Sequence, residues 1–325
     1  MDETPVFQDR SDLSDFKNAI ARIRDGVQEI LVGNSHVTDL MVVALIAGGH
    51  VLLEGVPGIA KTLMAKLLAK SLDIPFSRIQ FTPDLMPSDI LGTTIFNLQK
   101  SEFEFKKGPV FSGIVLIDEI NRSPAKTQAS LFEVMEEKQV TMDGNSYPMH
   151  SPFMVLATQN PIEQEGTYRL PEAQLDRFMF KIDMKYPNLE EEKEILHREN
   201  QGILGAQRNV KAVLSKEEII HFQNKARTIR IETPLLDYIA KIITATRNHN
   251  ALYLGASPRA SLALLNCTKA FAAIQGRDFG TPDDIRFLAP YILNHRVMVS
   301  PEREMEGLDS DKVIQEIISK TEVPR

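Results

Sequence analysis

Residues 50–62 read HVLLEGVPGIAKT, and this stretch decides the fold. His50 to Glu54 form a short apolar strand, and Leu63 to Leu72 consist of strong helix formers. A strand, a glycine-containing turn and a helix in this order are the context that a phosphate-binding loop requires. The usual pattern has glycine directly before the lysine, whereas this chain has Ala60, which is tolerable if its φ angle is negative. We therefore predict a nucleotide site, with an ordinary glycine-containing turn as the alternative.

Each part of GVPGIAKT (55–62) has a physical role at such a site. Gly55 and Gly58 let the backbone curl so that successive N–H groups point at phosphate oxygens, and the following helix presents its positive end to them. Lys61 would pair with the β- and γ-phosphates, and the Thr62 hydroxyl would ligate Mg²⁺. We expect ATP to contact the whole segment Gly55, Val56, Pro57, Gly58, Ile59, Ala60, Lys61, Thr62 and Leu63.

Apolar runs recur after the loop and alternate with helical segments. Strands are expected at 77–82, 114–120 and 153–161, and helices at 12–31, 36–47, 63–72 and 123–138. In the last helix, Ser123 is the expected N-cap and Pro124 the first helical residue. Buried strands that alternate with helices predict an α/β fold, a mostly parallel sheet with helices on both faces.

Two segments, 94–108 and 140–150, have the pattern of β-hairpins, the second around Asp143-Gly144-Asn145. The character of the chain changes near Tyr186-Pro187-Asn188, beyond which every segment is helical in period. We place a domain boundary at about 187, with an α/β domain over 1–187 and an all-helical domain over 188–325.

Composition excludes several classes of protein. The chain has 325 residues, is 43% hydrophobic and carries a net charge of −7, which disfavours bare nucleic acid as its main partner. A single cysteine, Cys267, excludes an internal disulfide framework. The most apolar run, 40–55, is divided by Gly48-Gly49-His50 into pieces too short to cross a bilayer. We expect a soluble, cytoplasmic protein without membrane insertion.

The buried strand that ends VLIDE places two acids, Asp118 and Glu119, at its carboxyl end. A buried strand ending in two acids is costly unless positive charge lies nearby. Asp118 would hold Mg²⁺, and Glu119 would orient and deprotonate the attacking water. A strand that simply runs into a solvated turn is the alternative.

Three further residues are weaker candidates when each is taken alone. Asn160 ends the strand FMVLATQN and could hold the same water, although asparagine at a strand end usually only helps to form a turn. Arg177 in LPEAQLDRF and Arg259 in ASPR could stabilise the charge that spreads over a transferring phosphoryl group. A lone surface arginine is more often a solvated charge, so order and spacing have to decide.

The order of these elements resembles the AAA+ ATPases: phosphate loop, Walker B acids, sensor 1 (Asn160), arginine finger (Arg177), helical domain and sensor 2 (Arg259). More narrowly, the chain resembles the MoxR branch over about residues 30–300. The matching stretches are GVPGIAKT, FTPDLMPSDILG, GPVF, LIDEINRSPAKTQASLFEVMEE, ATQNPIEQEGTYRLPEAQLDRF and GASPRA. Members of this branch often carry alanine before the lysine, which favours a functional loop. A departure is Arg169, where family members commonly have proline.

The resemblance implies more than the residues show alone. The arginine finger of AAA+ proteins reaches the nucleotide of a neighbouring subunit, which implies a homo-oligomeric ring, with six subunits expected. Arg259 would enter the site from a helical lid. MoxR proteins are similar in use to chaperones that remodel partner complexes, commonly with proteins bearing von Willebrand factor A domains. Their hairpins could line a pore or upper surface, where Lys100, Lys106 and Lys107 would contact a client, although charged hairpin tips are usually just solvated.

Three alternatives remain open. One is the motor subunit of a complex like magnesium chelatase, which is close in chemistry. Another is a DNA-remodelling AAA+ motor, against which the net acidity counts. The last is a regulator that binds ATP without hydrolysing it, which Lys61, Asp118, Glu119 and Arg177 disfavour. The sequence does not name the client.

Overall fold

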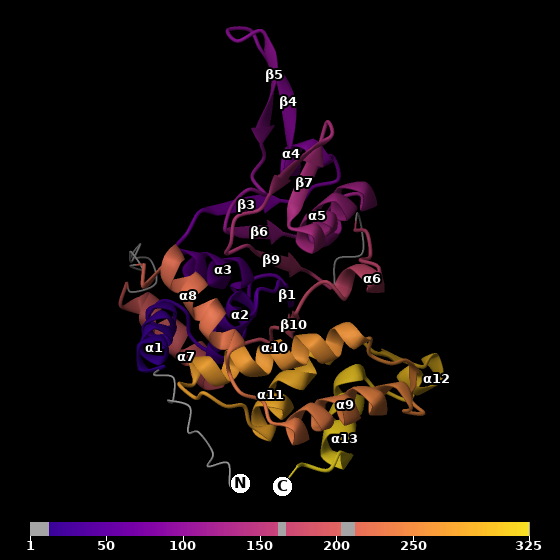
Figure 1. Ribbon diagram of the computed structural model, residues 1–325. Coiled ribbons are helices and arrows are strands. Elements are labelled where there is room, and N and C mark those ends of the chain that lie inside the picture. The colour runs from indigo at the N-terminus through magenta and orange to yellow at the C-terminus, as the bar shows by residue number, and fades with distance from the viewer. Residues whose placement is uncertain (1–12, 162–166, 203–211, 325) are drawn as a thin grey trace, which may run out of the picture.

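The computed structural model describes residues 13–161, 167–202 and 212–324 (Figure 1). A five-stranded sheet forms its centre, in the order β10-β1-β9-β6-β3, and every neighbouring pair is parallel. The strands are β1 (Val51–Glu54), β3 (Phe76–Gln80), β6 (Ile114–Asp118), β9 (Met154–Gln159) and β10 (Phe180–Asp183). The carboxyl ends of these strands therefore meet at one edge of the sheet, and the predicted parallel α/β fold is confirmed.

Both faces of this sheet are buried, which explains the continuous apolar runs. Along β6, Ile114 and Leu116 belong to one hydrophobic cluster, whereas Val115 and Ile117 belong to another. The first cluster also contains side chains of α1 (Ser14–Gln28), α2 (Ser35–Ala47) and α3 (Lys61–Lys70). The second contains side chains of α5 (Ala125–Glu137). Helices thus cover the two faces, as expected.

The start of α5 differs from its prediction. Pro124 occupies the N-cap position, α5 begins at Ala125, and no side chain caps the helix. Ser123 is extended, at φ −96° and ψ 156°, and its buried hydroxyl has no hydrogen-bond partner. A residue before proline is pushed out of the helical region, so the expected N-cap at Ser123 is wrong by one position.

Two hairpins extend the α/β part, and both were predicted. The first is formed by β4 (Gly92–Asn97) and β5 (Glu102–Lys107), and it projects from the body of the molecule (Figure 1). The second is formed by β7 (Gln139–Met142) and β8 (Asn145–Pro148). Phe105 stacks on Tyr147 with ring centroids 4.4 Å apart, so the hairpins brace each other at the base of the projection.

Strand β10 was not predicted, although it completes one side of the sheet. It is four residues long, and only Phe180 and Ile182 are buried within it. So short an alternation gives little periodic signal. Its pairing with β1 places Met184 beside the loop that follows Glu54.

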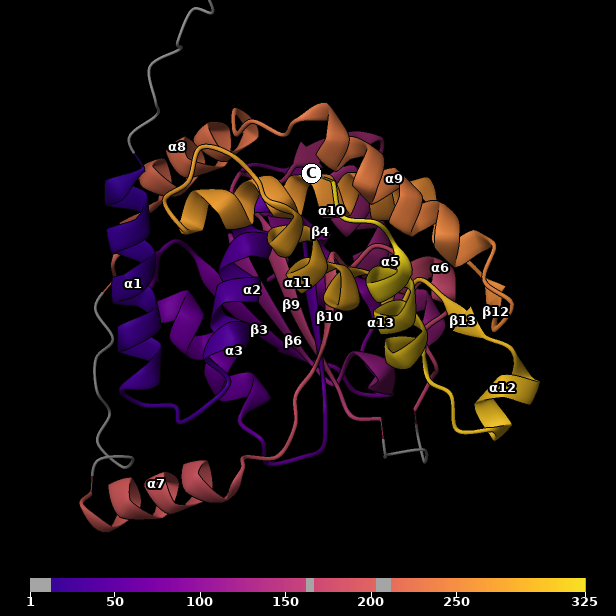
Figure 2. The ribbon, with the colours of Figure 1, turned by 90° about the horizontal axis from the view of Figure 1, so that it is seen from below.

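The C-terminal part is mainly helical and lies against the sheet domain (Figure 2). Its helices are α7 (Leu189–Asn200), α8 (Lys216–Arg227), α9 (Thr233–Arg247), α10 (Pro258–Ile274), α11 (Pro282–Leu293), α12 (Pro301–Met305) and α13 (Ser310–Lys320). The expectation of an all-helical domain is wrong in detail, because β12 (Leu252–Leu254) and β13 (Met298–Val299) form an antiparallel ribbon. These strands are too short to show a period of two in the sequence.

Helix α10 is the centre of this part, and it also packs against α2 and α8. One buried cluster therefore runs from α1 and α2 into α10 and α11. In addition, β11 (Leu214–Ser215) pairs with β2 (Leu72–Asp73) across the expected boundary. The division at residue 187 stays a prediction.

Candidate nucleotide site

The glycine-bearing loop connects β1 to α3 at the carboxyl edge of the sheet. Gly58 has a φ of +85°, a left-handed conformation that glycine adopts without strain. At Gly55 a side chain would not fit, because its Cβ would lie 2.8 Å from the carbonyl oxygen of Met184. Gly55 is therefore required sterically, and glycine at position 58 avoids the strain that a side chain would bring to a left-handed residue.

Ala60 contradicts the expected negative φ. It has a φ of +64° and a ψ of 23°, directly before α3. A left-handed residue with a side chain costs roughly 1–2 kcal/mol relative to the right-handed helical region. The loop thus holds the conformation that suits the usual glycine, and Ala60 stores the strain locally.

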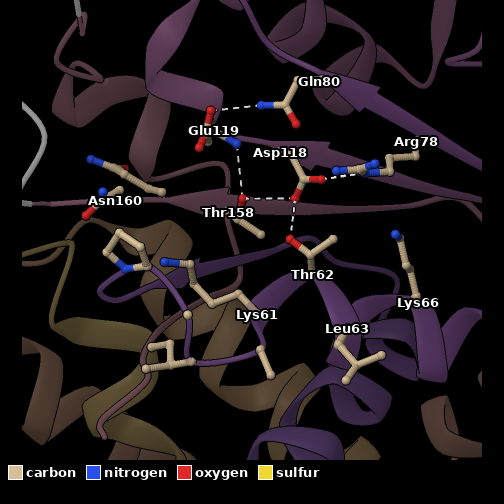
Figure 3. A pocket seen from close by; sticks show the side chains of 15 residues that line it. Lys61, Thr62, Leu63, Lys66, Arg78, Gln80, Asp118, Glu119, Thr158 and Asn160 are labelled. Atoms are coloured by element: carbon tan, nitrogen blue, oxygen red, sulfur yellow. Dashed lines mark hydrogen bonds and ion pairs between the residues drawn. The ribbon is translucent and has the colours of Figure 1, made fainter. Parts of the chain in front are cut away.

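Lys61 and Thr62 lie in the first turn of α3 and point to the inside of the loop and to the sheet edge (Figure 3). The ammonium group of Lys61 donates to the carbonyl oxygens of Gly55 and Val56, the latter at 3.0 Å. The Thr62 hydroxyl donates to Oδ1 of Asp118 at 2.8 Å. A cation, a hydroxyl and a carboxylate are thereby gathered at the start of one helix.

Asp118 is buried at the end of β6, where a carboxylate needs partners to offset its desolvation. Besides Thr62, the Thr158 hydroxyl donates to Oδ1 at 3.3 Å. Nε of Arg78 donates to Oδ2 at 2.6 Å. These contacts, drawn as dashed lines in Figure 3, hold the carboxylate in place.

Glu119, the second acid, has a left-handed backbone with a φ of +57°. Its N–H donates to Oγ1 of Thr158 at 3.0 Å, which holds the turn in place. Its carboxylate accepts a hydrogen bond from Gln80 at 2.8 Å and pairs with Arg122 at 3.0 Å. Strained residues of this kind cluster at functional sites, where the surrounding structure determines their conformation.

These side chains line one pocket with a volume of about 560 Å³. Asn160, at the end of β9, is buried and lines the same pocket. Ten of the residues expected to bind or process the nucleotide therefore line this pocket: Pro57, Gly58, Ile59, Ala60, Lys61, Thr62, Leu63, Asp118, Glu119 and Asn160. Gly55 and Val56, which were also expected to contact ATP, are not among its described lining residues.

The two candidate arginines lie elsewhere. Among the described residues that line the pocket, neither Arg177 nor Arg259 is present. Both instead pair with Glu136 at the end of α5: Arg177 at 3.6 Å, and Arg259 through Nη2 to the other carboxylate oxygen. Arg177 also donates to the carbonyl oxygen of Phe132 at 2.6 Å. The sequence left open whether Arg259 acts on its own subunit's nucleotide or on a neighbour's, and in the described structure Arg259 lies outside this chain's own pocket.

The residue before Arg177, Asp176, contacts the C-terminal helical part of the chain, which is the expected lid. Asp176 pairs with Arg296 at 2.6 Å, and the side chain of Arg296 is only 4% exposed. The Ser257 hydroxyl, at the start of α10, donates to the other oxygen of Asp176 at 3.3 Å. Arg177 and Arg259 are thus positioned together by contacts between the sheet domain and the lid.

Comparison with known proteins identifies the family. Residues 50–180 match the ATPase family associated with various cellular activities (AAA), and residues 244–317 match the AAA lid domain. The chain is 44% identical to the uncharacterized protein YeaC of Bacillus subtilis, covering 95% of this chain and 96% of that protein. It is 42% identical to Chaperone MoxR1 of Mycobacterium tuberculosis, covering 92% of this chain and 81% of that protein. The chain belongs to the MoxR family of AAA+ ATPases.

A solved structure agrees with this assignment. A crystal structure from Cytophaga hutchinsonii, described as a candidate ATPase, superimposes with a TM-score of 0.88 at 43% identity, covering 96% of this chain and 97% of that one. As a MoxR-family AAA+ ATPase, the chain is a nucleotide-binding enzyme that hydrolyses ATP. In the described ranges, none of the helices is long and apolar enough to span a membrane.

Sequence reasoning missed several residues of the MoxR site: Arg78, Gln80, Arg122 and Thr158. A signal was present for three of them. Arg78 and Gln80 alternate on the strand expected at 77–82, and Gln80 lies opposite Asp118 in the register of β3 and β6. Thr158 lies two residues before Asn160, so its side chain was already on a strand that ends at the site.

Arg169, the departure from the family pattern, is 86% exposed, and its side chain pairs with that of Glu172 at 3.3 Å.

Proposed function

We propose that this MoxR-family ATPase works as a homo-oligomeric ring, expected to be a hexamer, in which each ATP lies between two subunits. One subunit supplies the loop and the acids, and its neighbour supplies Arg177 and Arg259. The observation that carries the proposal is the pairing of both arginines on Glu136, outside the pocket that the loop and acids line. A heterologous interface of this kind, which joins one face of a subunit to a different face of its neighbour, forms a ring when the rotation between subunits closes.

Within one subunit, the loop and its surroundings suit a nucleoside triphosphate. Phosphates would lie over the loop, where Lys61 exchanges its carbonyl partners for phosphate oxygens. A second cavity of about 480 Å³ lies on the other side of the same loop and is lined by Ile30, Leu31, Val32 and Tyr186. Its apolar lining suits the base of ATP.

The donor groups fit Mg²⁺. Thr62 and Asp118 present a hydroxyl and a carboxylate oxygen 2.8 Å apart, and hard oxygen donors are the ligands that this ion prefers. When bound, Mg²⁺ would neutralise charge on the β- and γ-phosphates. Glu119 and Asn160 would orient the attacking water, and Glu119 would accept its proton.

The arginines would complete the site across the interface. Phosphoryl transfer spreads negative charge over the transferred oxygens, and a guanidinium group placed there stabilises that charge. Arg177 is 28% exposed and Arg259 is 51% exposed, so both can exchange Glu136 for phosphate oxygens. Contacts through Asp176 and Arg296 would make their position depend on the lid.

The cellular task is proposed by analogy with a relative named as a chaperone. ATP hydrolysis would drive the remodelling of a client protein complex in the cytoplasm, and proteins with von Willebrand factor A domains are the proposed partners. The projecting hairpin of β4 and β5 is the proposed client surface, because Leu98 is 85% and Phe103 is 76% exposed there. Exposed apolar groups on a projection mark a protein interaction site.

Two experiments test this function. ATP turnover per subunit should rise with protein concentration and reach a plateau with ring formation, whereas full turnover at concentrations where sedimentation shows only monomer would exclude a site shared between subunits. Proteins that co-purify with Glu119→Gln, which should retain ATP, identify the client. Recovery of chelatase subunits would favour the chelatase-like motor, and recovery of DNA would favour the DNA-remodelling motor.

A further inference from the structure

Arg78 is a cation of the pocket that the proposed mechanism leaves unused. It lies on β3, lines the same pocket as Lys61 and Asp118, and its side chain is 46% exposed. Its Nε donates to Oδ2 of Asp118 at 2.6 Å, whereas the Asp118 side chain is only 4% exposed. A partly solvated guanidinium group is therefore the counter-charge of a buried carboxylate.

Asp118 has three hydrogen-bond partners among the described residues. Oδ1 accepts from the hydroxyls of Thr62 and Thr158, and Oδ2 accepts from Arg78. A divalent ion that takes this carboxylate as a ligand has to share it with, or remove it from, the guanidinium group. Two cations on one carboxylate repel each other, and the repulsion is weakly screened beside a buried group.

We infer that Arg78 is a displaceable counter-ion that competes with the divalent metal for Asp118 and so sets the metal concentration at which the nucleotide is held tightly. Because its side chain is half-exposed, Arg78 can leave Asp118 for solvent when the metal arrives. Removal of Arg78 leaves a buried carboxylate without its counter-charge, which makes Asp118 a stronger metal ligand. The inference rests on the proposed function of the site.

The test measures binding rather than turnover. The full chain is titrated with a fluorescent, non-hydrolysable ATP analogue at a series of free Mg²⁺ concentrations, and the Mg²⁺ midpoint of the gain in affinity is recorded. Arg78→Gln should lower this midpoint about tenfold or more, the ratio that corresponds to one lost charge-assisted hydrogen bond. Arg78→Lys keeps the positive charge, so its Mg²⁺ midpoint should stay closer to that of the wild type.

A matched control removes a different cation from the same pocket. Lys66 also lines the pocket, but the partners of Asp118 described above do not include it. Lys66→Gln should therefore move the midpoint less than Arg78→Gln. An unchanged or higher midpoint in Arg78→Gln, or an equal decrease in Lys66→Gln, overturns the inference.

Failure of the proposed function and failure of the role of Arg78 give different results. If the wild type binds no analogue at any Mg²⁺ concentration, the proposed function fails. If the wild type binds the analogue but the Arg78 variants have the same Mg²⁺ midpoint as the wild type, the proposed function stands and the role given to Arg78 is wrong. Circular dichroism melting confirms folding, and Arg78→Met, which also removes the charge and should also lower the midpoint, keeps the test decisive should Arg78→Gln not fold.

Discussion

Replacement of Thr158 by valine tests whether one buried hydroxyl organises both acids of the site. Thr158 is 3% exposed, accepts the N–H of Glu119 at 3.0 Å and donates to Asp118 at 3.3 Å. Valine has nearly the same shape, so the variant removes the two hydrogen bonds without a cavity. The change therefore isolates the polar contribution.

The expected magnitude follows from the two bonds. A buried donor left without an acceptor costs about 1–3 kcal/mol, and Asp118 keeps its bond to Thr62. A loss of about 2 kcal/mol in the free energy of unfolding should lower the melting temperature by roughly 4 °C in a chain of this size. Without its anchor, Glu119 can relax from its φ of +57°, and displacement of a catalytic group should lower kcat roughly 10- to 100-fold.

Calorimetry and steady-state ATPase kinetics measure the two effects separately. Thr158→Ser keeps the hydroxyl and loses only the methyl group, so it should retain most of kcat despite some loss of stability. Affinity for the ATP analogue should change little in either variant, because Lys61 and the loop are intact. The reasoning is refuted if Thr158→Val melts and turns over like the wild type, or if Thr158→Ser loses as much kcat as Thr158→Val.

Three further predictions concern the loop and the core. Lys61→Ala should abolish analogue binding in a fluorescence titration, because the phosphates lose their cation; binding near wild-type affinity would contradict the site. Ala60→Gly should raise stability in denaturant melts by about 1 kcal/mol, since glycine accepts a φ of +64° without strain; a less stable variant would contradict this reading. Burial lowers the pKa of His50 from 6.5 to about 4, while its Nδ1 accepts the N–H of Val155. Because the unfolded chain binds the proton at a higher pH than the folded chain, the free energy of unfolding should fall as the pH drops from 6.5 to about 4, at up to about 1.4 kcal/mol per pH unit. In denaturant melts, His50→Gln should show a weaker dependence of this free energy on pH. An equally steep dependence in His50→Gln would contradict the role of His50.

The central sheet and the loop could be predicted because their signals are local. The apolar run of β6 ends in two acids, and GVPGIAKT lies between a strand and a helix. In both cases the neighbouring residues in the sequence are enough to identify the element. The conformation of Ala60 could not be predicted in the same way. Its positive φ is imposed by the path between β1 and α3, which overrides the preference of alanine.

The rest of the site depends on contacts between distant segments. Arg78 meets Asp118 across 40 residues, and Arg259 meets Glu136 across 123. No pattern within a strand or helix encodes such pairings, so the sequence did not show whether Arg259 serves its own subunit's pocket or a neighbour's. The family resemblance pointed to the two arginines as site residues, whereas only the structure shows that both pair with Glu136.

The most direct test of the shared site mixes two inactive variants. Glu119→Gln lacks the group that activates water, and Arg177→Ala lacks the proposed finger, which should slow hydrolysis on the order of 10³-fold or more. In a random equal mixture, about one quarter of the interfaces would join an intact Glu119 to a neighbour's intact Arg177. ATP turnover should therefore recover to a substantial fraction of the wild-type rate, up to about one quarter if interfaces act independently. If the mixture forms rings yet stays as inactive as its components, Arg177 does not act across the interface.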